Sequence, residues 1–182
     1  MKKIITIPHP TLRKTAKVVT HYDKKLKNFV TELEETLAKK RNPRGVGLAA
    51  PQVDKLWRIF CINIAGIETF INPRVIKQSK RITFGPDEED PILEACLSIP
   101  DLYGPVPRFS WVEIECQVID GDKLSEKKLR LEDFKARVFQ HELDHLDGVL
   151  FTDYSLKYDL PVYKKSKGDK YEEIDNALLE LF

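Results

Sequence analysis

Apolar residues recur at helical spacing in two stretches of the chain. Residues 24–40 place apolar side chains along one face, and Asp23 precedes them where an N-cap is expected. Residues 133–147 carry two apolar stripes, and Gly148 follows them at the position of a C-terminal cap. The first pattern predicts an amphipathic helix, and the second predicts a helix buried on both sides.

Short or alternating apolar runs predict strands elsewhere. Residues 57–65 and 67–71 are separated by one glycine and form a predicted hairpin, whose second strand is expected to end at Asn72-Pro73. Apolar and polar residues alternate from residue 112 to residue 118, and an Asp-Gly turn follows. Together these elements predict an α+β fold in which antiparallel sheets surround the buried helix, with the first helix packed outside.

Two further stretches lack a clear apolar pattern. Residues 78–91 are mostly polar, with an acidic run from Asp87 to Asp90, and are predicted to form a solvated loop. Residues 164–182 are charged as far as Asn176 and then rich in leucine. This tail fits either a short docking helix or a frayed end.

Length and composition narrow the class of protein. A chain of 182 residues with 42% hydrophobic content predicts a single domain over residues 1–182, without a membrane span. Thirty Lys and Arg against 29 Asp and Glu leave a net charge of +1, so no dedicated nucleic-acid site is expected. The first apolar stretch is broken at Pro8, and three cysteines cannot all pair, which favours a cytoplasmic protein.

The strongest chemical signal is the sequence His141-Glu142-Leu143-Asp144-His145. Residues four apart lie on one helix face, so both imidazoles can reach one metal ion while Glu142 lies beside them. The alternative is a pair of surface residues or of core histidines with satisfied hydrogen bonds. The shared apolar stripe and the accompanying acid favour a hydrolytic metal site.

A catalytic site of this kind needs a third protein ligand. Several acids but no further histidine follow the helix. The upstream candidate is Cys96, in the sequence EACLS at residues 94–98, because Cys61 and Cys116 are better explained as buried core residues. A thiolate at Cys96 would complete a Cys-His-His set.

Three motifs taken together resemble the peptide deformylase family. They are GVGLAAPQ at residues 45–52, EACLS at 94–98 and QHELDH at 140–145. The resemblance runs from about Thr6 to Asp153, and the tail from about residue 155 diverges. It implies a metal-dependent hydrolase that removes the N-formyl group from the N-terminal methionine of newly made proteins and releases formate.

One motif residue departs from the family pattern. Ala95 stands where the family normally has glycine. Alanine tolerates a positive φ poorly, so residue 95 is predicted to have a negative φ.

The resemblance also implies roles for individual residues. The metal ligands would be Cys96, His141 and His145. Glu142 would be the general base and acid, and the Gln52 side chain and the Leu97 backbone N–H would stabilise the oxyanion. An ion pair between Glu94 and Arg108 would steady the cysteine segment.

The methionine side chain of the substrate requires an apolar slot beside the metal. Phe134 and Val138 precede His141 on its own helix face, and Val46 and Gly47 are candidates for the opposite wall. Packing in the core would account equally well for Phe134 and Val138.

The cofactor implied is one divalent metal ion. The resemblance indicates Fe²⁺, although a Cys-His-His set also accepts Zn²⁺, Ni²⁺ or Co²⁺. The partner implied is an N-formyl-methionyl peptide, and association with the ribosome is left open.

Two other functions compete with this interpretation. A small zinc metallopeptidase would use the same helix but place its third ligand downstream. A binding protein with a structural metal would need a fourth ligand, and none is evident near the motifs.

Overall fold

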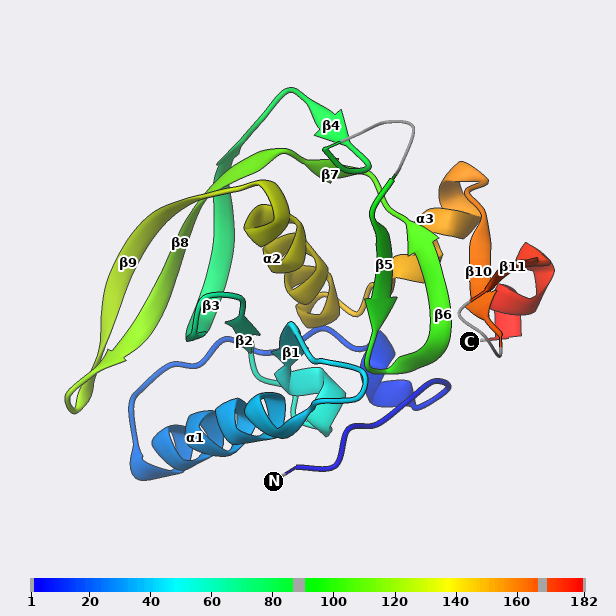
Figure 1. The fold of residues 1–182 in the computed structure, drawn as a ribbon. Coiled ribbons are helices and arrows are strands. Elements are labelled where there is room, and N and C mark those ends of the chain that lie inside the picture. The colour runs from blue at the N-terminus through cyan, green and yellow to red at the C-terminus, as the bar shows by residue number, and fades with distance from the viewer. Residues whose placement is uncertain (1, 87–90, 167–169, 182) are drawn as a thin grey trace.

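One antiparallel sheet carries most of the core of the computed structural model, which describes residues 2–86, 91–166 and 170–181. Its five strands run in the order β1-β2-β3-β8-β9 (Figure 1). They are β1 (Gly47–Ala49), β2 (Ile59–Asn63), β3 (Ile67–Gln78), β8 (Trp111–Asp120) and β9 (Lys123–Glu132). Every neighbouring pair is antiparallel, in agreement with the predicted α+β class.

A second antiparallel sheet carries the cysteine motif. Its strand order is β11-β10-β6-β5. These strands are β5 (Leu93–Cys96), β6 (Ile99–Pro105), β10 (Val162–Lys165) and β11 (Tyr171–Ile174). A small pair, β4 (Ile82–Thr83) with β7 (Arg108–Phe109), connects the regions. Helix α2 (Asp133–Leu146) lies between the five-stranded sheet and strands β5 and β6 (Figure 1).

Strand β2 is apolar from Ile59 to Ile62 because both of its faces are covered. Ile59 and Cys61 pack in the cluster that contains α1 (Lys24–Lys39), whereas Phe60 and Ile62 pack in the cluster that contains α2. Successive side chains of a strand point to opposite faces, so one short run serves two cores. The helix that carries the histidines therefore rests on a sheet supported from behind by α1.

Both predicted helices are confirmed, with their caps. The Asp23 carboxylate accepts a hydrogen bond of 2.6 Å from the backbone N–H of Leu26 at the start of α1. Helix α2 ends at Leu146, and Gly148 has a φ of 74° just beyond it. The turn between β8 and β9 is also as predicted, with a φ of 60° at Gly121.

The predicted end of a strand at Asn72-Pro73 is wrong. Strand β3 continues to Gln78, with a register shift between Ile71 and Arg74 in its pairing with β8. Asn72 takes a φ of 50°, and its side-chain amide bonds to Val19 and Gln117. A bulge leaves a residue outside the ladder, so the proline does not end the strand.

The loop and tail predictions are only partly met. The stretch 78–91 contains β4, while the acidic run of residues 87–90 lies outside the described residues. The tail adds β10 and β11 to the second sheet, which neither expectation included. A 3₁₀ helix, Asn176–Leu181, then buries Leu179 beside an unpredicted helix, α3 (Phe151–Tyr158).

A helix that spans a membrane needs about 20 consecutive, mostly apolar residues. Within the described ranges, no helix is long and apolar enough to cross a bilayer.

Candidate active site

Helix α2 presents both histidines of the H-E-x-x-H motif to the interior. His141 and His145 are 9% and 1% exposed, and their ring centroids lie 5.0 Å apart. They share a face because they are separated by about one helical turn. The burial of two imidazoles on one face predicts a shared ligand rather than independent surface roles.

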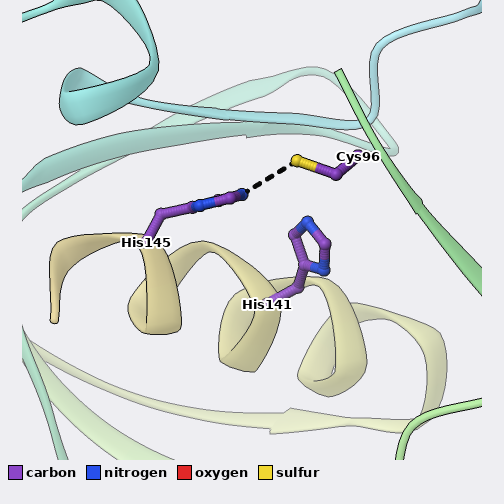
Figure 2. A group of neighbouring side chains, drawn as sticks. All are labelled: Cys96, His141 and His145. Atoms are coloured by element: carbon purple, nitrogen blue, oxygen red, sulfur yellow. Dashed lines mark hydrogen bonds between the residues drawn. The ribbon is translucent and has the colours of Figure 1, made fainter. Parts of the chain in front are cut away.

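Cys96 meets these histidines from the end of β5. Its Sγ atom lies 3.2 Å from Nε2 of His145, and one donor atom from each of the three residues falls within 4.8 Å of the others. Figure 2 shows the thiol directed from the strand toward the two rings on the helix. The backbone N–H of Ser98 points at the same sulfur from 3.4 Å.

A buried carboxylate, that of Glu94, orients His141. Glu94 Oε2 lies 2.9 Å from Nδ1 of His141, and Arg108 donates two hydrogen bonds of 2.9 and 3.0 Å to the same carboxylate. Arg137 adds a third at 2.9 Å. Burial alone would raise the pKa of Glu94, but the contacts with Arg108 and His141 hold that pKa well below its usual range. A carboxylate that fixes the second ring nitrogen is typical of metal-binding histidines.

Glu142 lies beside the donor atoms in a tight site. Its side chain is 3% exposed, and its Oε2 atom has no hydrogen-bond partner among the described residues. Burial raises the pKa of Glu142 to about 7. A carboxyl group with this pKa is suited to accept and return a proton near neutral pH.

Gln52 reaches the site from a short 3₁₀ helix, Ala50–Val53. Its Oε1 atom accepts a hydrogen bond of 2.8 Å from the backbone N–H of Ala49, so the amide NH₂ faces Cys96. Nε2 lies 3.4 Å from the Cys96 sulfur and 3.2 Å from the Ser98 hydroxyl. The side chain is therefore held as a donor directed at the site.

A cavity of about 440 Å³ opens beside these groups. Its lining includes these predicted site residues: Val46, Gly47, Gln52, Cys96, Leu97, Phe134, Val138, His141 and Glu142. This volume is within the range of small-ligand sites. An apolar wall next to a donor set and a buried carboxyl group is an arrangement suited to hydrolysis of a bond near an apolar side chain.

Comparison with known proteins identifies the family. The sequence model of polypeptide deformylase matches residues 1–159. This chain belongs to that family. As a member, it is a hydrolase that removes the N-formyl group from the N-terminal methionine of newly made proteins.

Individual deformylases extend the match over most of the chain. Peptide deformylase 1 of Bacillus subtilis is 37% identical over 161 residues, covering 87% of this chain and 92% of its own length. A peptide deformylase of Bartonella tribocorum is 33% identical over 183 residues, which cover 98% of this chain and 99% of that protein. The crystal structure of peptide deformylase from Thermotoga maritima superposes with a TM-score of 0.74 at 35% identity, covering 85% of this chain and 97% of that one.

The deformylase fold brings the predicted site residues together, with one correction. Phe134 is 43% exposed, so the expectation that its stripe is wholly buried is wrong. It lies in the first turn of α2 and lines the open cavity, which leaves its ring accessible to solvent. The predicted Glu94–Arg108 ion pair is present, and Ala95 lies in β5 and is not among the residues with positive φ.

Several residues of the site were not predicted from the sequence. Arg137 contacts Glu94 and also donates to the backbone carbonyls of Val106 and Thr83. Its position four residues before His141 places it on the same face, so a buried arginine there was a usable signal. The hydroxyl of Ser98 gave no comparable signal, because its role depends on a contact with Gln52, 46 residues away in the sequence.

Proposed function

We propose that Cys96, His141 and His145 together bind the single divalent metal ion of this deformylase. The proposal rests on one observation, the convergence of three buried donor atoms from two elements within 4.8 Å. One thiolate and two imidazoles fit a borderline metal ion, and three protein ligands leave a position for water or substrate. We propose Fe²⁺ as the native ion, with Zn²⁺, Ni²⁺ and Co²⁺ as substitutes.

The fit of this donor set is supported by the contacts of the ring nitrogens. His141 uses Nδ1 toward Glu94, so its Nε2 is left for a ligand. His145 directs Nε2 toward Cys96, while its Nδ1 has no partner among the described residues. When bound, a divalent ion acts as a Lewis acid that acidifies water and polarises the formyl carbonyl.

We assign proton transfer to Glu142. Its carboxylate accepts a proton from the attacking water and later delivers a proton to the amine of methionine as it leaves. Burial raises the pKa of this carboxyl group above its usual range, which favours the protonated form that the second step requires. Its unpaired Oε2 atom offers an acceptor that no described residue occupies.

We assign the oxyanion donors to Gln52 and Leu97. The Gln52 amide is fixed by Ala49, so its NH₂ group stays directed into the site, where it can exchange its contact with Cys96 or Ser98 for one with the oxygen of the formyl group. The backbone N–H of Leu97 follows Cys96 directly and would supply a second donor. Loss of one such donor typically lowers kcat about 10²–10³-fold.

The methionine side chain is proposed to occupy the apolar part of the cavity. Val138 and Phe134 lie one and two turns before His141, and Val46 and Gly47 line the same cavity.

We also propose a single catalytic domain over residues 1–182, since β10 and β11 join the sheet that carries Cys96. Action in the cytoplasm and association with the ribosome, where formylated chains emerge, remain proposals.

The test is anaerobic purification with metal analysis, followed by measurement of formate release from formyl-Met-Ala-Ser. Cys96→Ser is expected to lose metal and activity together, because a hydroxyl replaces the soft thiolate donor. Cys116→Ser is the matched control and should lose neither, since Cys116 lies in the core. Full metal content in Cys96→Ser would remove Cys96 from the proposed site.

A further inference from the structure

The two proposed oxyanion donors belong to separate elements of the fold. Gln52 lies in the short 3₁₀ helix that follows β1 of the five-stranded sheet. Leu97 lies in the turn between β5 and β6 of the second sheet, directly after Cys96. Two donors can stabilise one oxyanion only if they are held at a fixed separation. The contacts that set the distance between these two elements therefore matter for the proposed reaction.

The Gln52 side chain cannot set this distance by itself. Among the described residues, the hydrogen bonds that join the 3₁₀ helix directly to residues 96–98 come from its Nε2 atom, which contacts the Cys96 sulfur and the Ser98 hydroxyl. The same NH₂ group is the proposed donor to the formyl oxygen. At least one of these contacts is therefore lost at the step in which the separation of the two elements matters most.

The N-terminal segment bonds to both elements through its backbone. The N–H of Ile5 donates a hydrogen bond of 2.9 Å to the carbonyl oxygen of Gln52, and the N–H of Ile7 donates one of 3.0 Å to the carbonyl oxygen of Ser98. Figure 1 shows this segment, in blue, running past the short helix toward the turn between β5 and β6. Ile5 and Ile7 are not among the cavity-lining residues, so a bound substrate leaves both hydrogen bonds in place.

The spacing of these two donors can fix a distance. In an extended chain, the N–H groups of residues two apart point to the same side and lie about 7 Å from each other. Ile5 and Ile7 have this spacing, and the chain from Lys2 to Thr6 contains no helix or turn. One short stretch of backbone therefore determines how far apart the two carbonyl groups lie.

Side chains of the same segment pack against both halves of the site. Ile4 packs against the buried cluster that contains Ala50, and Ile7 packs against the buried cluster that contains Cys96. The turn that Ile7 binds is closed by the hydrogen bond of 3.4 Å from the Ser98 N–H to the Cys96 sulfur. The backbone between these two residues, which carries the second donor, is thus held together with the segment.

We propose that residues 5–7 are a positioning segment, which holds the Gln52 amide and the Leu97 N–H at the separation that the oxyanion requires. The inference rests on the proposed function, because it takes these two groups as the oxyanion donors. The segment acts only through the two carbonyl groups that it binds. Oxyanion donors act mainly in the transition state, so a loss of positioning should lower kcat and leave KM and metal content almost unchanged.

The test removes the N–H that reaches Gln52. Proline has no backbone N–H, so Ile5→Pro should lower kcat for formate release from formyl-Met-Ala-Ser by about tenfold or more, with KM within about twofold of wild type. Lys3→Pro is the matched control, because the Lys3 N–H makes no hydrogen bond to a described residue. It should keep the wild-type kcat. An equal loss in Lys3→Pro would overturn the inference.

An ester in place of the amide between Ile4 and Ile5 provides a second variant. It removes the same N–H without changing a side chain, and it carries the test if Ile5→Pro does not fold. Its kcat should fall while its metal content stays at the wild-type ratio. A wild-type kcat in the ester variant would show that the hydrogen bond does not position the donors.

A double-mutant cycle with Gln52→Ala separates positioning from a general loss of stability. Gln52→Ala alone should lower kcat about 10²–10³-fold. Ile5→Pro or the ester should then lower kcat by less than about twofold further, because the donor that the segment positions is already absent. The same fold loss in both backgrounds would overturn the inference alone. A wild-type kcat in Gln52→Ala would overturn the proposed oxyanion role as well.

Discussion

The backbone of Gly47 lies directly against the carboxyl group of Glu142. A β-carbon added at Gly47 would lie 2.6 Å from Cδ and 2.8 Å from Cγ of Glu142, closer than real β-carbons approach other atoms. Gly47 is not among the residues with positive φ, so the need for glycine here is one of space. Strand β1 thereby fixes the position of the proposed general base.

Gly47→Ala should therefore displace Glu142 and lower kcat/KM at least about 10²-fold, since a positioned base typically contributes 10²–10⁴-fold. Metal content should not change, because the three atoms nearest to a β-carbon at Gly47 all belong to Glu142 and none belongs to a proposed ligand. Combination with Glu142→Asp provides a double-mutant cycle. A loss smaller than the product of the two single losses is expected, and strict additivity would contradict the contact.

Glu142→Gln should separate metal binding from turnover. The amide keeps the size of the side chain but cannot take a proton from water, so activity should fall on the order of 10²–10⁴-fold. The metal should stay bound at the wild-type ratio, measured by elemental analysis. Loss of the ion, or turnover close to wild type, would mean that the role of Glu142 is wrongly assigned.

Glu94→Gln should affect both folding and metal binding. Removing this buried anion leaves Arg137 without its carboxylate partner, whereas Arg108 keeps its ion pair with Asp144; breaking a buried ion pair typically costs 3–5 kcal/mol of unfolding free energy. Loss of the bond to His141 should also weaken metal affinity about 10–100-fold. Urea unfolding and competition with a chelator measure the two effects. Glu113→Gln, at a partly exposed ion pair, is the control and should change stability by less than about 0.5 kcal/mol.

Ala95→Gly should change little. Ala95 is exposed in β5 and needs no left-handed backbone, so glycine restores the family residue without relieving strain. Metal content should be unchanged and kcat/KM should differ by less than about tenfold, the equivalent of roughly 1.4 kcal/mol. A large gain in formate release would instead mean that the methyl group obstructs the substrate in this chain.

Ionisation of Cys116 should lower the free energy of unfolding of the protein at alkaline pH. Burial raises the pKa of its thiol from 9.0 to about 11. The unfolded thiol therefore ionises first, so the stabilisation is complete below pH 9 and declines between pH 9 and 11. Cys116→Ala removes this group. Between pH 8 and pH 10.5, the free energy of unfolding of the variant should therefore fall by about 1–2 kcal/mol less than that of the wild-type protein. Equal losses in urea unfolding would contradict the assignment.

The site was predictable from the sequence because its signals are local. His141 and His145 lie one turn apart on a helix that is itself evident from periodicity, and Cys96 stands in a short motif. The Glu94 cluster was predicted only in part: the ion pair with Arg108 was expected, whereas Arg137 joins the cluster through tertiary packing. The sequence pattern therefore predicted the residues that supply metal donor atoms better than it predicted the residues that hold them in position.

The missed elements depend on distant contacts. Strand β3 passes Pro73 because of a bulge against β8, about 40 residues away. The hairpin of β10 and β11 forms on the edge of β6, and its charged residues pair across strands, as Lys164 does with Glu172. A charged sequence of this kind has no helical or alternating apolar pattern, so periodicity could not identify it.

The cluster around Glu94 has a consequence for exchange of the metal ion. The carboxylate lies on the strand that carries Cys96 and holds both Arg137 and His141 of α2, so the two halves of the donor set are connected by protein contacts alone. Ordering of the ligands then occurs during folding rather than during metal capture. Zinc fingers behave in the opposite way, because they unfold when the ion is removed. This enzyme should instead exchange one divalent ion for another without unfolding. The ion that it binds would then depend on which divalent ions are available around it.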